Sequence, residues 1–194
     1  MSIRLRHTFA ATAAILAFAA PCAAQQPAAA PRAGLMGDLL KDVAEVQAKF
    51  VGLAREMPAD KQAWRPGPGV RSVNEVFLHV AADNYLLPAA VGVQPDASTG
   101  ISTTDFKTLD TFEKQKLSRD ATVSAMEQSF AHLTKAMADT PDAKLDDRVT
   151  FFGQDMTVRQ VWVLTAMHLH EHLGQAIAYA RTNGVVPPWS RKGG

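Results

Sequence analysis

The stretch TVRQVWVLTAMHLHEHLGQAIAYARTNG, residues 157–184, has the features of one long helix. Thr157 is suited to cap its N-terminus, and Asn183-Gly184 is a typical C-terminal stop. The same segment predicts a candidate site, because it holds three of the six histidines of the chain within five positions: His168, His170 and His172.

Helical geometry divides these three histidines between two faces. Each residue of an α-helix advances by about 100°, so His168 and His172 differ by about 40°, whereas His170 points about 200° away from His168. Imidazoles four residues apart can converge on one metal ion. We therefore expect His168 and His172 to form a pair and His170 to face the other side. Gln175 returns to the face of the pair, where its amide could hydrogen-bond a ligand or a metal-bound water.

A second segment, SVNEVFLHVAADN at 72–84, supplies another imidazole. Its first residues form a Ser-x-x-Glu capping box, which predicts a helix to about residue 91. Glu75, His79 and Asp83 share a face of this helix, and one of the carboxylates could accept the other ring N–H of His79. We expect His79 to be the third metal ligand. The candidates for a base or an orienting group are Asp83 first, then Glu75 and Gln175.

Three neutral imidazoles suit zinc, nickel, copper or iron(II), and an open fourth position is typical of catalytic zinc. Zinc is the first choice here, with nickel, manganese or iron as alternatives. The zinc-protease motif HExxH is absent, because Gly174 stands four residues after His170. Spacing alone leaves another interpretation open, in which the histidines face solvent or form hydrogen bonds in the core without any metal.

Two further amphipathic segments, 35–57 and about 119–138, carry apolar residues at spacings of three and four. Residues 92–117 show no period and predict a long connection, with room for a short helical turn. Residues 144–156 predict a small hairpin turning at 153–155, or an extended stretch. We expect an all-α fold: a four-helix bundle with the long connection between its second and third helices and the hairpin before the fourth. His132 is expected at the surface.

The first 24 residues have the pattern of a cleaved signal peptide. Arg4 and Arg6 precede an uncharged run from Thr8 to Ala24 that is too short and too rich in alanine for a membrane span. Residues 25–34 are expected to be a flexible leader, and 35–190 to form one domain. A periplasmic or secreted protein is predicted, with no membrane attachment after cleavage.

The only cysteine, Cys22, falls within this predicted signal peptide. Ala20-Pro21 is a poor approach to a lipidated cysteine, so cleavage near residue 24 is favoured. The mature chain then has no disulfide, no thiolate ligand and no cysteine nucleophile. Loss of Arg4 and Arg6 lowers the formal net charge from +1 to −1, so we expect no nucleic-acid partner.

Three segments together resemble the DinB-like superfamily of metal-dependent four-helix-bundle proteins, in the same order and over nearly the whole mature chain. They are WRPGPGVRSVNEVFLHVAADN (64–84), HLHEHLGQAIAYAR (168–181) and GVVPPWS (184–190). The resemblance implies one metal-binding histidine on the second helix and an H-x-x-x-H-x-G-Q pair on the last, at His79, His168 and His172. Gly174 would then allow a neighbouring helix or ligand to come close.

The resemblance does not imply one activity, because relatives include thiol-dependent transferases and isomerases and suspected metal-dependent hydrolases. Export argues against the thiol-dependent group, since the periplasm is not expected to hold much reduced thiol cofactor. We therefore expect a divalent-metal-dependent enzyme of the hydrolase or transferase class that acts on an unknown small molecule. The alternatives are a metal-binding or stress-response bundle without turnover, and a bundle that forms a homodimer through its apolar faces.

Overall fold

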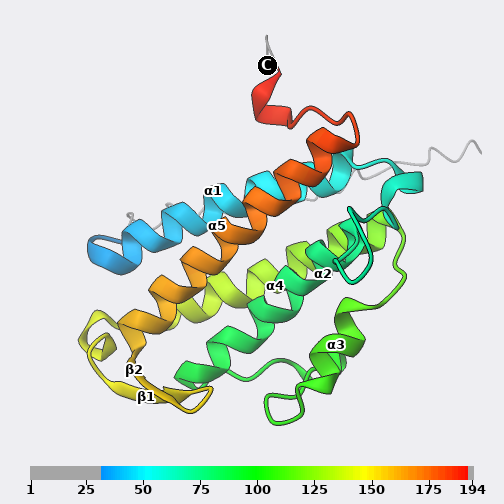
Figure 1. Cartoon of the computed structure of the whole chain (residues 1–194). Helices are drawn as coiled ribbons and strands as arrows, with labels where there is room; N and C mark the ends of the chain where they lie inside the picture. Colours follow the sequence, from blue (N-terminus) through cyan, green and yellow to red (C-terminus); the bar gives the residue numbers. More distant parts are fainter. Residues whose placement is uncertain (1–31, 192–194) are drawn as a thin grey trace, which may run out of the picture. The chain divides into compact units, whose positions relative to one another are not determined.

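The computed structural model describes residues 32–191, which form a four-helix bundle as predicted (Figure 1). The long helices are α1 (Gly34–Glu56), α2 (Val73–Leu86), α4 (Arg119–Asp139) and α5 (Val158–Thr182). None of the described helices combines the length and the apolar character that a membrane span requires. The predicted signal peptide at 1–24 and most of the predicted leader at 25–34 lie outside the described residues.

The connection between α2 and α4 contains more structure than its sequence predicts. Its main element is α3 (Lys107–Glu113), and shorter 3₁₀ turns cover Leu87–Val91 and Ala97–Thr99. The α-helical geometry of α2 ends at Leu86, five residues before the predicted end, and the chain continues as a 3₁₀ turn. Pro88 explains this change, because proline has no N–H to continue the α-helical hydrogen bonds.

The hairpin before α5 is confirmed, although its turn lies earlier than predicted. Strand β1 (Arg148–Phe151) pairs antiparallel with β2 (Gln154–Thr157), and Phe151 lies opposite Gln154. Phe152 and Gly153 therefore form a two-residue loop, with φ values of 50° and 72°. Positive φ at both positions is the geometry that matches the twist of two paired strands. Further 3₁₀ turns cover Ala59–Lys61, Asp142–Lys144 and Pro188–Ser190.

Both helices that carry the histidine site begin with a capping box. At α2 the backbone N–H of Glu75 donates to Ser72 Oγ at 3.3 Å, and the N–H of Ser72 donates to Glu75 Oε2 at 2.6 Å. At α5 the reciprocal bonds join Thr157 and Gln160. These local bonds satisfy N–H groups that have no partner inside the helix, and so fix where each helix starts.

Aromatic side chains from all four long helices fill the core. The ring of Phe50 on α1 lies 6.4 Å from that of Phe77 on α2 and 6.2 Å from that of Phe130 on α4, and Trp162 on α5 is fully buried. Burial of this much apolar surface is the main favourable contribution to folding. The core therefore fixes α2 and α5, the two helices that carry the site, in one arrangement.

Two expectations about single residues are wrong in part, and the approach of a ligand to Gly174 stays a prediction. Gly174 does not permit close packing within the described part of the chain, because a Cβ atom built there would have no neighbour within 4 Å. His132 is not simply a surface residue: it is half-buried, and its ring lies 5.2 Å from that of Tyr85. Helical periodicity predicted the face of each residue but not the surroundings of that face.

Loss of the α2 cap should destabilise the bundle. We expect Ser72→Ala to lower the free energy of unfolding by about 1 kcal/mol, because the backbone N–H of Glu75 loses its acceptor, Ser72 Oγ. Urea denaturation would measure this loss. Ser124→Ala, an exposed change within α4, is the control and should stay within about 0.5 kcal/mol of the wild type. Equal stability of the two variants would contradict the assigned cap.

Candidate metal centre

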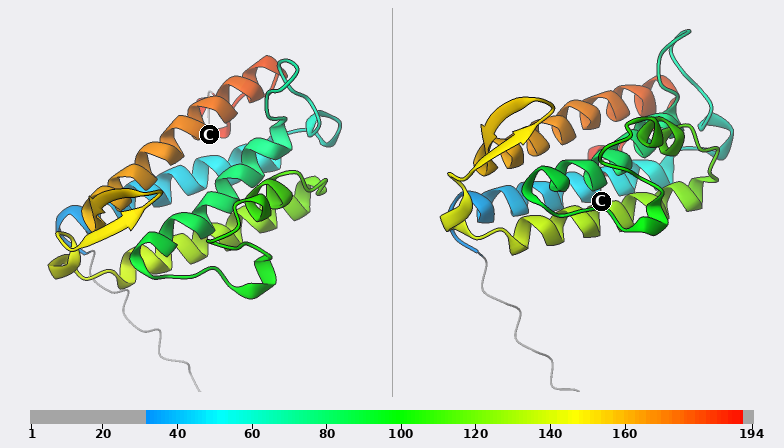
Figure 2. Two further views of the ribbon diagram at one scale, coloured as in Figure 1. Left: turned by 60° about the horizontal axis from the view of Figure 1, so that its bottom comes forward. Right: turned by 90° about the horizontal axis from the view of Figure 1, so that it is seen from below.

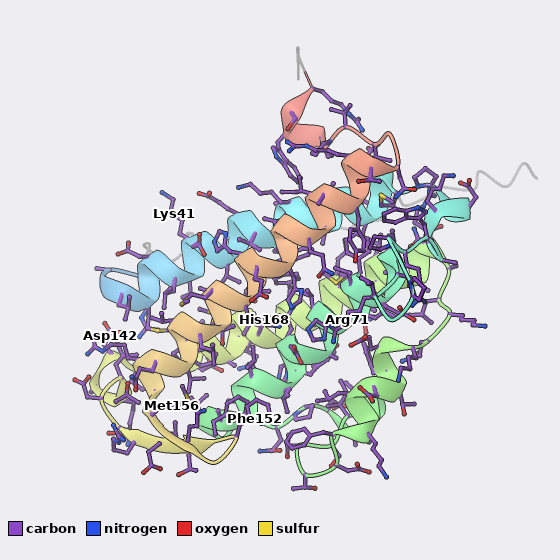
Figure 3. The ribbon with its side chains drawn as sticks, in the orientation of Figure 1. Lys41, Arg71, Asp142, Phe152, Met156 and His168 are labelled. Atoms are coloured by element: carbon purple, nitrogen blue, oxygen red, sulfur yellow. The ribbon has the colours of Figure 1, made fainter. Side chains whose placement is uncertain are left out.

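Three imidazoles meet between α2 and α5. His79 comes from α2, and His168 and His172 come from successive turns of α5. His168 is labelled in Figure 3. One ring nitrogen of each residue lies within 4.8 Å of those of the other two. The ring centroids are 4.5 to 5.3 Å apart. The structure thus brings together the three histidines that the sequence predicts as one group.

The fourth histidine of this region faces away from the group. His170 Nε2 lies 2.9 Å from both carboxylate oxygens of Asp42 on α1, and its side chain is about half exposed. This orientation agrees with the helical geometry, which separates His170 from His168 and His172. His170 is therefore a natural control for any measurement on the other three.

Nε2 of His79 and Nε2 of His172 lie only 3.1 Å apart, and each ring has a hydrogen-bond acceptor behind it. Glu113 Oε2 is 3.1 Å from His79 Nδ1, and Gln175 Oε1 is 2.9 Å from His172 Nδ1. These oxygens favour a proton on Nδ1 of both rings, because the acceptor at His79 Nε2, Asp83 Oδ2, is farther away at 3.3 Å. A ring in this form has a lone pair on Nε2. Two facing lone pairs cannot form a hydrogen bond with each other, but they can bind one cation.

The spacing of these nitrogens fits a divalent metal. A tetrahedral ion with metal–nitrogen bonds of about 2.0–2.1 Å holds its ligand atoms about 3.3 Å apart. The 3.1 Å between the two Nε2 atoms is close to this value. Burial lowers the pKa of His172, and the neighbouring His168 and His79 lower it further against the opposing hydrogen bond to Gln175. His172 is therefore neutral at neutral pH, as a metal ligand must be.

Asp83 lies at the same centre as the imidazoles. Its Oδ2 atom is 3.0 Å from His168 Nε2 and 3.3 Å from His79 Nε2. The sequence places Asp83 one turn beyond His79 as a base or orienting group, and the structure adds its contact with α5. This carboxylate can accept a proton at the centre or provide an oxygen ligand.

His168 is the least restrained of the three imidazoles. Its Nδ1 atom is buried and has no hydrogen-bond partner among the described residues. The Nδ1 atoms of His79 and His172 each have a side-chain acceptor instead. The proton position of His168 is thus determined by what lies at its Nε2 atom, which is Asp83 in this structure.

The carboxylate behind His79 is a residue that sequence reasoning missed. Glu113, the last residue of α3, contacts His79 Nδ1 with one oxygen and accepts a hydrogen bond from Arg71 Nε at 2.7 Å with the other. Burial opposes ionisation of this carboxyl group, but the bonds from His79 and Arg71 and the charge of Arg71 lower the pKa of Glu113 to about 2. No sequence pattern links the connection to His79, so only the fold could identify this residue.

Glu75 makes other contacts than those expected of it, whereas Gln175 lies where an orienting group is expected. Glu75 closes the capping box of α2 and pairs with Arg65 at 3.0 Å, so the carboxylate at His79 Nδ1 comes from α3 instead. Gln175 accepts from the ring of His172 and donates to the hydroxyl of Tyr179 at 3.1 Å. It therefore orients a candidate ligand from behind, at the position of a supporting residue in a metal site.

Solved structures of DinB-like proteins have the same fold. The chain is 15% identical to one from Bacillus cereus, with a TM-score of 0.65 and coverage of 79% of this chain and 95% of that one. For YjoA from Bacillus subtilis the identity is 15%, the TM-score 0.60 and the coverage 80% and 99%. YfiT from Bacillus subtilis is 14% identical, with a TM-score of 0.63 and coverage of 86% and 97%. YfiT is described as a probable metal-dependent hydrolase with an unusual four-helix bundle topology.

The sequence itself identifies the family. No curated protein matches the chain significantly. The model of the DinB superfamily, however, matches residues 43–176, a range that includes all three histidines of the centre as well as Asp83 and Glu113. Because this match covers more than half of the chain, and because the fold agrees with it, the protein belongs to the DinB superfamily.

Proposed function

We propose that this protein is a metal-dependent enzyme in which His79, His168 and His172 hold one divalent ion. The observation that carries the proposal is the 3.1 Å approach of two Nε2 atoms whose rings each have an acceptor oxygen next to Nδ1. The likeness to YfiT, a probable metal-dependent hydrolase, supports the same function.

The side chains around the histidines have separate tasks in this proposal. A bound ion would supply Lewis-acid polarisation or a water of lowered pKa. Glu113 and Gln175 hold ring protons at Nδ1, so that Nε2 of His79 and of His172 stays free for coordination. Asp83 Oδ2 lies against the centre, where it can take a proton from a nucleophile and return it to a leaving group.

Hydrolysis is the reaction class that the proposal favours over group transfer to a thiol. The sequence of residues 1–24 is typical of export, and the periplasm supplies water but not a high concentration of reduced thiol cofactor. Zinc is the first metal to test, because imidazole nitrogen with one carboxylate oxygen is a common zinc ligand set. Nickel, manganese and iron are the alternatives. The substrate is a small molecule whose reacting group can approach an ion held between two helices.

The position of Asp83 also supports one alternative function. A carboxylate oxygen within 3.3 Å of two Nε2 atoms could serve as a fourth ligand and complete a tetrahedral site. A site closed in this way would store or buffer metal without turnover. The two functions differ in whether the ion keeps a position for an external ligand.

Metal content tests the first step of the proposal. We expect the mature, tag-free protein to hold about one divalent ion per chain by inductively coupled plasma mass spectrometry. His79→Ala and His172→Ala should lose the ion, because each removes one of the two converging Nε2 atoms. His170→Ala is the matched control on α5 and should retain it. A wild-type protein that binds no added zinc, nickel or manganese would disprove the metalloenzyme function.

Asp83→Asn separates the catalytic function from the storage function. If Asp83 is a base, the variant should keep its metal affinity within about tenfold, while kcat on a screened ester or amide substrate falls by about 10²–10⁴. If Asp83 is a fourth ligand, the variant should lose most of its metal affinity. The cobalt(II) protein gives an independent readout: added azide should change its visible spectrum only where a coordination position is open.

A further inference from the structure

The metal centre includes a group from outside the four-helix bundle. Helix α3 has only seven residues and belongs to the connection between α2 and α4, outside the four long helices (Figure 2). Its last residue nevertheless reaches the ring of His79. The Glu113 side chain is 12% exposed, so its two bonded oxygens are largely shielded from water. A connection that provides a buried charge to a site has more than a linking role.

We propose that Glu113 is a positioning residue of the metal centre, which keeps the proton of His79 on Nδ1 and thereby links the docking of α3 to metal binding. The inference rests on the proposed metal-binding function. A neutral imidazole can carry its proton on either nitrogen, and only the form protonated on Nδ1 has an Nε2 lone pair for a metal. Glu113 Oε2, at 3.1 Å from Nδ1, stabilises that form.

Arg71 holds the Glu113 carboxylate in the orientation that this role requires. Its Nε atom donates to Glu113 Oε1 at 2.7 Å, so each oxygen of the carboxylate has one donor. Arg71 directly precedes Ser72, the N-cap of α2, and α2 also carries His79. Both partners of the carboxylate therefore belong to one rigid segment, and Glu113 fits there only when α3 is docked.

The rest of α3 is attached through half-buried side chains, which makes the contact of Glu113 important for docking. No residue of α3 is fully buried. Leu109 and Phe112 are half-buried, and the ring of Phe112 lies 6.2 Å from that of Tyr85 on α2. A helix of two turns gains little stability from its own hydrogen bonds. Opening of α3 should therefore cost much less free energy than unfolding of the bundle.

Thermodynamic linkage makes the coupling between α3 docking and metal binding reciprocal. If docked α3 raises the metal affinity of His79 by some factor, bound metal must favour docked α3 by the same factor. Groups that support metal ligands from behind typically contribute about 10- to 100-fold to affinity. We expect metal binding to protect the amides of residues 107–113 from hydrogen exchange by a factor in this range.

Glu113→Gln and Glu113→Ala distinguish positioning from a structural role. In the glutamine variant Arg71, which can only donate, should attract the amide oxygen, so the amide NH₂ group should face His79 Nδ1. That group stabilises the wrong imidazole form, with the proton on Nε2. The isosteric variant should therefore lose at least as much zinc affinity as the alanine variant, whereas a merely structural role predicts a smaller loss.

Zinc affinity, measured by competition with a chromophoric chelator, is the first readout. We expect both Glu113 variants to bind zinc about 10- to 100-fold more weakly than the wild type. Asp110→Asn is the matched control: Asp110 also lies on α3 but is exposed, and among the described residues its carboxylate pairs only with Lys114. Its affinity should stay within about twofold. An equal loss in this control, or a glutamine variant that binds like the wild type, would overturn the positioning role.

Nitrogen-15 NMR of the metal-free protein is the second readout, and it does not depend on metal binding. The His79 ring should carry its proton on Nδ1 in the wild type and on Nε2 in Glu113→Gln. The same ring form in both proteins would overturn the inference even if zinc binds well. A wild-type protein that shows the expected ring form but binds no metal would instead overturn the proposed function and the linkage to α3.

Discussion

The approach of His79 and His172, with their Nε2 atoms 3.1 Å apart, is the constraint on which the site depends. Polar atoms placed between packed helices reduce stability unless they have partners, so the rest of the fold must hold α2 and α5 in place. The apolar core does this, since Phe77 on α2 and Trp162 on α5 are both almost completely buried. The apolar interior therefore provides the free energy of folding. The facing ring nitrogens reduce it locally, and a bound cation would remove this loss.

Much of this arrangement follows from patterns within single helices. The periodicity of the apolar residues predicts the four long helices, and the capping box at Ser72 predicts the start of α2 to within a residue. Helical geometry alone separates His170 from His168 and His172, as the bond between His170 and Asp42 confirms. Each of these features depends on residues less than two helical turns apart. For such residues, the distance in sequence determines the distance in space.

The remaining features depend on contacts that local geometry does not determine. Glu113 reaches His79 only because the connection folds back along α2, and no periodic pattern in residues 92–117 indicates that path. Gln175 is an orienting candidate whose exact partner the spacing did not determine. Its distance of seven residues from His168 suggested a position facing the ligand, but its neighbour three residues before, His172, is closer and takes its amide oxygen. The hairpin turn likewise lies at Phe152-Gly153, where the backbone twist requires positive φ at both positions.

The site thus combines two kinds of support. His79, His168 and His172 belong to helices fixed by the core, so their relative positions should change little with the state of the connection. The group that selects the metal-binding form of His79 belongs instead to α3, a short helix without a fully buried residue. With the proposed role of Glu113, ligand geometry depends on helices packed in the core, whereas the protonated form of His79 depends on a short helix at the surface of that core. Motion of α3 can change the affinity of the centre without any rearrangement of the bundle, because a proton shift within one imidazole ring is sufficient.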